Sequence, residues 1–233
     1  MAKNLEWYLR NIRRRLDDFG GDVQADTWLS DDSACEWKND ELVDYINEAV
    51  EEVAQRYPIR DNVSSLCVLD LLAGVGVYEY DPLIMTIERA TLSSNSKKLE
   101  KLTETDMDYF KEDDVEEVLY YLENETSNLI RLITTPTVDD TLLLEVTRLP
   151  LEELAFSDLT AFPEVPENFS KDLIHWVLHL AYSKEGPTTQ DLTRAAYFEN
   201  RFVDKMGERP DAKQRGVRRA LANKKLRSTT YFS

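Results

Sequence analysis

The chain has 233 residues, of which 42% are hydrophobic and 10% aromatic, so it holds enough apolar material for a core and is not a disordered protein. Its length suits one compact domain with extensions or two small domains. The net charge of -17 is uneven, because nine basic residues against two acidic ones from Lys205 onward leave -24 on residues 1–204. Such an acidic body repels nucleic acid, whereas the basic tail favours an acidic partner or DNA.

The cysteine usage and hydropathy indicate a cytoplasm-like compartment. Cys35 and Cys67 lie far apart without metal-ligand spacing. We expect reduced, structural thiols, although a disulfide between them stays open. No stretch approaches the roughly 20 apolar residues that span a membrane, and the N-terminus lacks the apolar core of a signal peptide.

The first expected helix covers residues 4–18 and ends at Gly20-Gly21. The basic residues Arg10, Arg13 and Arg14 occupy positions off its apolar stripe. That stripe consists of Leu5, Leu9, Ile12 and Leu16.

A second helix begins near residue 39, where Asn39 or Asp40 can cap it, and ends before Pro58. Acidic residues crowd the face opposite its core stripe. The core stripe consists of Leu42, Ile46, Ala49, Val50, Val53 and Tyr57.

Residues 64–92 change character to β-branched and aromatic residues interrupted by glycine and proline. A short helix begins over 105–109, and the acidic stretch 111–126 forms a helix or a loop. The strands 128–133 and 141–148 are expected to pair as a β-hairpin. The other expected strands are 78–80, 83–92 and 98–102.

Two further helices follow a proline-marked linker over 162–166. The first spans about 167–184 and the second about 189–206, with Gly207 as a C-cap. The inward-facing residues expected in the second are Leu192, Ala195, Ala196, Phe202, Val203 and Met206.

The order of elements predicts a mainly α fold: a small helical bundle with a β-rich insertion between its second and third main helices, and an extended C-terminal arm. The expected segments are bundle helices over 1–62 and 151–207, the β-rich insertion over 63–150, and the basic arm over 208–233.

No catalytic, cofactor or metal site is expected. His175 and His179 share a helix face, but Trp176 follows the first histidine where a metalloprotease needs glutamate, and no third ligand is evident. Paired aspartates such as Asp139-Asp140 are adjacent, and glycosidase chemistry needs carboxylates across a cleft. Gly74-Val75-Gly76 lacks the lysine and helix of a phosphate loop and suits a turn between strands.

Several segments together resemble the head-to-tail adaptor (neck, connector) proteins of tailed bacteriophages. Residues 37–49 resemble the opening of their main helix, and 78–82 resemble the strand that follows, with Asp81-Pro82 in place of the usual Leu-Pro. Residues 163–184 and 191–202 resemble their two later helices. The likeness runs in order through most of 1–207, and the β-rich middle matches least.

The resemblance implies a structural virion protein rather than an enzyme. It would be made in the host bacterial cytoplasm and form a ring of about twelve copies at the neck. The ring would dock on the portal protein, contact its neighbouring copies and a downstream tail or nozzle protein, and conduct DNA without binding it specifically. The arm residues expected to bind the portal are Arg215, Arg218, Arg219, Lys224, Lys225, Leu226, Arg227, Tyr231 and Phe232.

Two alternatives stay open at this point. One is a peptidoglycan hydrolase associated with the tail, although no catalytic pair of carboxylates is evident. The other is a nucleic-acid-binding protein that uses the basic arm, although its acidic body disfavours high affinity and no recognisable binding motif accompanies the arm.

Overall fold

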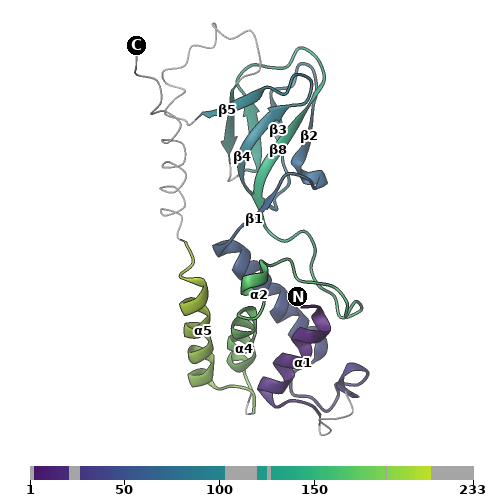
Figure 1. Ribbon diagram of the computed structural model, residues 1–233, viewed down its shortest axis with the longest axis vertical. Helices are drawn as coiled ribbons and strands as arrows, with labels where there is room; N and C mark the ends of the chain where they lie inside the picture. Colours follow the sequence, from purple (N-terminus) through teal and green to yellow (C-terminus); the bar gives the residue numbers. More distant parts are fainter. Residues whose placement is uncertain (1–2, 21–26, 103–119, 125–126, 187, 211–233) are drawn as a thin grey trace. The chain divides into compact units, whose positions relative to one another are not determined.

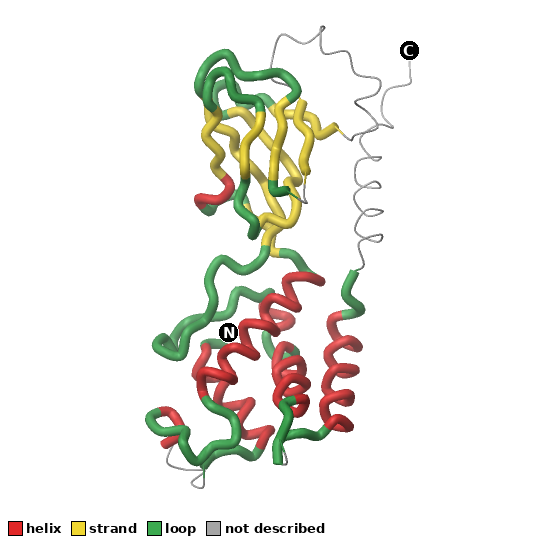
Figure 2. The backbone as a smooth tube through the Cα atoms, turned by 180° about the vertical axis from the view of Figure 1, so that it is seen from behind, coloured by secondary structure: helices red, strands yellow, loops and turns green. Residues whose placement is uncertain are grey.

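The structure is a computed structural model that describes residues 3–20, 27–102, 120–124, 127–186 and 188–210 (Figure 1). The chain divides into two compact units, one of residues 1–57 with 152–233 and one of residues 58–151. The α-helices belong to the first unit and the strands to the second, as Figure 2 shows by colour. We call them the helical unit and the β unit.

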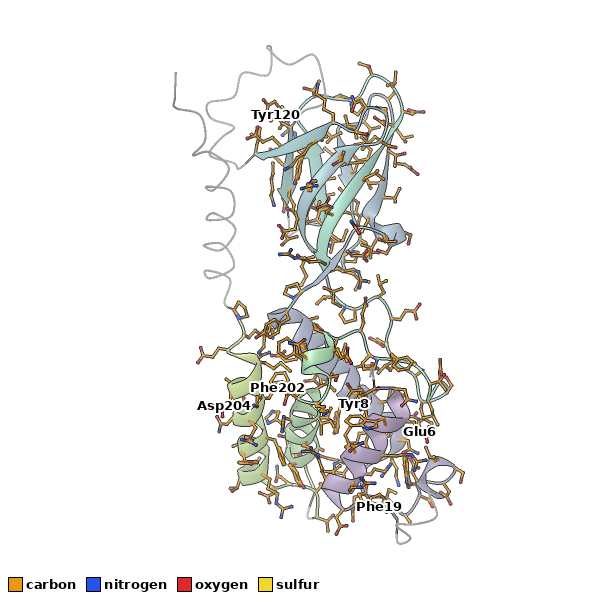
Figure 3. All side chains as sticks on the ribbon, in the orientation of Figure 1. Glu6, Tyr8, Phe19, Tyr120, Phe202 and Asp204 are labelled. Carbon is orange, nitrogen blue, oxygen red and sulfur yellow. The ribbon has the colours of Figure 1, made fainter. Side chains whose placement is uncertain are left out.

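The helical unit packs its helices around one apolar core to which both N-terminal and C-terminal segments contribute. Helix α4 packs against α1, α2 and α5. Figure 3 shows Phe202 on the inner side of α5 and Asp204 on its outer side. The described helices are α1 (Leu5–Leu16), η1 (Thr27–Leu29), α2 (Asn39–Arg56), η4 (Glu167–Phe169), α4 (Leu173–Ser183) and α5 (Leu192–Met206).

The four long helices predicted from the sequence are confirmed, with shifts at some ends. The predicted stripe of α1 is buried, and Asn4 caps this helix by accepting a hydrogen bond from the Trp7 N–H. The acidic face of α2 is exposed as expected. Helix α4 starts at Leu173 rather than near 167, because the preceding residues form the separate 3-10 turn η4.

The capping prediction for α2 is wrong. The carboxylate of Asp32 accepts the Asn39 N–H at 2.5 Å, so a loop residue satisfies the helix start from outside. The Asn39 side chain turns inward instead, where it accepts from Arg13 and donates to the Trp28 carbonyl.

The placement of Arg13 off the core stripe is also wrong, because its side chain is fully buried. Its guanidinium donates to the carboxylate of Asp18 at 2.9 Å, to the Trp37 carbonyl at 2.9 Å and to Asn39 Oδ1 at 2.6 Å. A buried charge is tolerated only when paired and hydrogen-bonded, and this network supplies both.

Helix α5 buries a narrower stripe than predicted. Ala195, Phe202 and Met206 are buried, but Leu192 is 64% exposed and Ala196 is also exposed. The reason is that α5 packs mainly against α4, and its C-terminal end also contacts Val53 of α2, so one narrow face is covered.

The β unit is a mixed eight-stranded sheet that curls, in the order β1-β8-β4-β5-β6-β7-β3, with β2 also pairing β8 (Figure 1). The long strands β4 and β8 pair antiparallel along their length, and β5 and β6 pair in parallel. The strands are β1 (Ile59–Asp61), β2 (Val68–Leu71), β3 (Val77–Glu79), β4 (Ile84–Leu92), β5 (Lys98–Leu102), β6 (Tyr120–Asn124), β7 (Leu129–Leu132) and β8 (Asp140–Arg148), with η2 (Ser65–Cys67) before β2.

The prediction of a mainly α fold is therefore wrong. The β segment is no appendage of a bundle: it forms its own compact unit with a separate hydrophobic core. The physical reason lies in the alternation along β8, where Leu142, Leu144 and Val146 are buried on one face. A sheet with a continuous apolar face can bury it by curling upon itself, so it needs no helix to complete a core.

The predicted hairpin of 128–133 with 141–148 is wrong as well. Strand β7 pairs with β3 and β6, whereas β8 pairs with β1, β2 and β4. Within the acidic stretch 111–126, residues 120–124 form strand β6, and its other residues lie outside the described chain, as do 105–109. Tyr121 explains the strand, because its ring is buried in the core of the β unit.

The predicted turn at residues 74–76 is confirmed. Gly74 lies in the turn between β2 and β3, with a φ of 82° that suits glycine. Cys35 and Cys67 are free thiols, and each is buried in a different unit. None of the helices that the structure describes combines the length and apolar character needed to cross a bilayer.

Candidate functional site

The nine arm residues predicted to bind a partner lie outside the described residues, but the root of the arm is described. Helix α5 ends at Met206, and Gly207 follows as its C-cap with a φ of 74° and a ψ of 173° that turn the chain away. Arg209 donates to Gln55 at 2.6 Å and lies 3.7 Å from the carboxylate of Glu52, and Pro210 is buried. The arm therefore leaves the helical unit from a fixed point at the end of α2.

Arg56 joins the ends of α2 and α5 at this root. Its Nε donates to the Gly207 carbonyl at 2.8 Å, and its guanidinium pairs with Glu52 one turn earlier. The same guanidinium lies 5.0 Å from the ring centre of Phe202 and 5.9 Å from that of Trp176. The Arg56 guanidinium thus packs on two aromatic rings of the core and also donates a hydrogen bond to the backbone at the start of the arm.

The two histidines of α4 are engaged with backbone oxygens. His175 Nδ1 lies 3.1 Å from the Asp172 carbonyl, and His179 Nδ1 lies 3.1 Å from the Ala195 carbonyl. Burial, helped by the charge of Arg15, lowers the pKa of His175 below its ordinary value. His175 stacks on the ring of Phe198, and His179 contacts the Ala195 carbonyl, so the pair packs α4 against α5. Within the described ranges no three side chains gather as metal ligands.

A pocket of about 200 Å³ opens beside the loops that follow β4 and precede β8. It is smaller than the 300–1,000 Å³ typical of small-molecule sites. Its carboxylate, Asp140, already accepts hydrogen bonds from the Ser94 N–H and hydroxyl and from the Thr141 N–H. The described residues of this pocket therefore build a loop junction rather than a catalytic cleft.

The family comparison gives these surfaces their context. The model of the family described as SU10 adaptor protein matches residues 9–225, which is most of the chain. The chain belongs to the SU10 adaptor protein family. No curated protein matches it.

The family membership confirms the resemblance to phage head-to-tail adaptors. This adaptor is a structural component of the bacteriophage particle. The segments that carried the resemblance are now placed: residues 37–49 run into α2, 78–82 contain the end of β3, and 191–202 form most of α5. A structural adaptor acts through surfaces, so its exposed charge and apolar area are the candidate functional features.

The adaptor carries one strongly acidic surface on α2. Its exposed carboxylates share one side of the helix, opposite the buried stripe that contacts α4. These residues are Asp40, Asp44, Glu48 and Glu51. Like charges at helical spacing repel one another, so this face stabilises the helix less than a mixed face would, and it gives this side of α2 a negative potential.

The adaptor also exposes apolar residues on the β unit, which the sequence reading missed. Val68 and Leu143 lie directly opposite each other on β2 and β8, 48% and 45% exposed. Leu72, Val75 and Val77, around the β2–β3 turn, are likewise exposed. The sequence does show these exposed residues, through the adjacent apolar pairs Val68-Leu69 and Leu71-Leu72. Adjacent residues of an extended chain point to opposite faces, so one residue of each pair must lie outside the core.

Proposed function

We propose that this adaptor forms a ring, of about twelve copies, that docks on the portal at the neck of the virion and provides the platform for a downstream tail or nozzle protein. The membership in the adaptor family is the observation that carries this proposal. In such a ring the copies contact their neighbours, and the genome passes through a central channel.

The charge of the chain supports a channel that conducts DNA without holding it. Residues 1–204 carry -24, and the acidic face of α2 is exposed. Repeated around a ring, this charge repels phosphates and prevents adhesion during packaging and ejection.

The arm supports docking on the portal. Its basic residues suit an acidic portal surface, and its apolar residues suit pockets. Hydrogen bonds at Gly207 and Arg209 fix the first residues of the arm on the helical unit. Docking therefore costs less conformational entropy than it would for an arm whose first residues make no contacts. The proposed contacts are Arg215, Arg218, Arg219, Lys224, Lys225, Leu226, Arg227, Tyr231 and Phe232.

Size-exclusion chromatography with light scattering tests the proposal, first on the full chain and then on its mixture with the cognate portal ring. We expect the two to co-elute with one adaptor copy for each portal subunit. An adaptor that never associates with the assembled portal would overturn the proposal.

A chain ending at Pro210 is the matched variant for the arm. We expect it to keep the circular dichroism and melting temperature of the full chain and to lose portal binding. If the shortened chain still co-elutes with the portal, the arm is not the docking segment, whereas the adaptor role itself stands.

A further inference from the structure

Strand β3 leaves one edge of the curled sheet open. The Gly76 carbonyl accepts from the Leu132 N–H at 2.8 Å, and the Tyr80 N–H donates to the Asn128 carbonyl at 2.9 Å. Antiparallel ladders bond at every second residue, so Val77 and Glu79 direct their backbone N–H and C=O groups away from β7. Among the described strands β3 pairs with β7 alone, so no described strand is hydrogen-bonded to its outer side.

The edge formed by β2 is better protected than the edge formed by β3. The Val68 N–H of β2 already donates to the Ser65 carbonyl. The Tyr78 hydroxyl accepts from the Leu72 N–H at 3.1 Å and donates to the Leu72 carbonyl at 3.0 Å. The outer N–H of Val68 and the backbone of Leu72, just beyond β2, are thus engaged, so β3 is the more accessible of these two edges for a new strand.

The surroundings of β3 indicate the chemistry of a strand that would join it. Val77 is 50% exposed, and Val75 and Leu72 nearby are exposed too, so an apolar strand gains buried area there. Residues 58–151 hold eight basic and nineteen acidic residues, a net charge of -11. The exposed carboxylate of Glu79 stands on the edge itself. The occupant should be extended, rich in β-forming residues and basic.

The C-terminal end of this chain has these properties. Residues 224–232 read Lys-Lys-Leu-Arg-Ser-Thr-Thr-Tyr-Phe, which combines three cations with threonines and aromatic residues that favour strands. The described chain ends at Pro210, and the 15 residues between it and Leu226 reach up to about 50 Å when extended. A tether of that length does not confine the segment to the helical unit from which it starts.

We propose that residues 226–232 of one copy add to the outer edge of β3 in a second copy as an extra strand. The backbone of the incoming segment bonds to Val77 and Glu79. Its Arg227, with Lys224 and Lys225 just before the segment, meets the acidic β unit. The pairing is head-to-tail, because arm and edge are different surfaces, and such contacts generate rings when they close.

This inference rests on the proposed association of copies but not on portal binding. The edge is short, so the contact is weak between free copies and strengthens at the high local concentration inside a ring. Leu226, Arg227, Tyr231 and Phe232 are also among the proposed portal contacts, so the strand pairing belongs to copies whose arms are not docked on the portal.

Disulfide trapping between full-length chains tests the pairing without portal. One chain carries Val77→Cys, and its partner carries a single cysteine at position 228, 229, 230 or 231. Both native thiols are buried and do not compete. Because strand side chains alternate, we expect the yield of mixed dimer to alternate along these four positions and to exceed, several-fold at its peak, the yield with Val63→Cys as acceptor. Val63 is 87% exposed in the same unit, so it reports random collisions. Flat yields, or equal yields with the two acceptors, would overturn the proposal.

A proline variant isolates the backbone contact. Val77→Pro removes an N–H that points away from β7, so the β3–β7 ladder is kept. With Glu79→Cys as the acceptor, we expect Val77→Pro to abolish trapping and Val77→Thr to retain it, at unchanged circular dichroism. Equal trapping by the two variants would contradict strand addition. Co-elution of the wild-type chain with portal is measured separately, so failure here leaves the adaptor role untouched.

Discussion

The guanidinium of Arg13 and the carboxylate of Asp18 lie 2.9 Å apart with both side chains almost fully removed from water. The same carboxylate accepts the N–H groups of Glu36 and Trp37, so the pair ties α1 to the loop before α2. Removing the cation leaves a buried carboxylate without its partner. We expect Arg13→Met to destabilise the helical unit by about 3–5 kcal/mol.

Tryptophan fluorescence during urea unfolding measures this change, because all four tryptophans of the chain belong to the helical unit. The control is Arg10→Met on the same helix, which breaks a half-exposed pair with Glu6 and should cost at most about 0.5 kcal/mol. Equal losses for the two variants would contradict the buried network.

Asp61 and Arg148 form the corresponding pair in the β unit, at 2.5 Å. Burial opposes the charge of Asp61, but hydrogen bonds from Ser64, the Val63 N–H and Arg148 outweigh it and hold its pKa well below the usual range. A lowered pKa in the folded state gives stability that is present above the unfolded value of about 3.9 and is lost as the pH falls below it.

We therefore expect Asp61→Asn to destabilise the β unit by about 2 kcal/mol at pH 7 and by progressively less below pH ~4. Hydrogen exchange of the β8 amides, followed against pH, measures the difference. The exposed Asp70→Asn serves as the control and should change exchange little at any pH. A loss for Asp61→Asn that stays constant down to acid pH would exclude this linkage.

Gly207 has backbone angles that side chains tolerate poorly. We expect Gly207→Ala to cost about 1–3 kcal/mol through strain, although a Cβ there meets no neighbouring atom within 4 Å. Thermal unfolding measures the cost. Gly76→Ala is the comparison, because Gly76 has no such positive φ and its added Cβ makes an ordinary contact with Thr135. A neutral Gly207→Ala would show that the arm root relaxes.

The basic arm should make portal binding depend on salt. Charge reversal at Lys224, Lys225 and Arg227 together is expected to weaken binding at least about tenfold at low ionic strength, with unchanged melting temperature. Substituting Lys97 and Lys98 with glutamate makes a smaller charge change away from the arm and should leave the affinity nearly intact. Equal losses would indicate a response to net charge rather than to the arm.

Local patterns in the sequence predicted the four long helices, because an amphipathic helix needs only a partner surface and repeats its apolar residues every three to four positions. The cap at Asn4 and the end at Gly207 follow the same local rules. The family could also be recognised from short segments such as residues 37–49.

The sequence did not determine the features that depend on contacts between residues far apart in the chain. Strands β7 and β8 each satisfy an alternating pattern, but alternation does not say which strand lies alongside, and the expected hairpin did not form. Arg13 reads as a surface residue until Asp18 and Asn39 surround it. The sequence of β3 does not distinguish it from the other strands, and only the sheet order shows that no described strand pairs with its outer edge. Periodicity fixes which face of an element is apolar, whereas pairing, burial of charge and free edges are decided by which elements meet, and only the tertiary structure determines that.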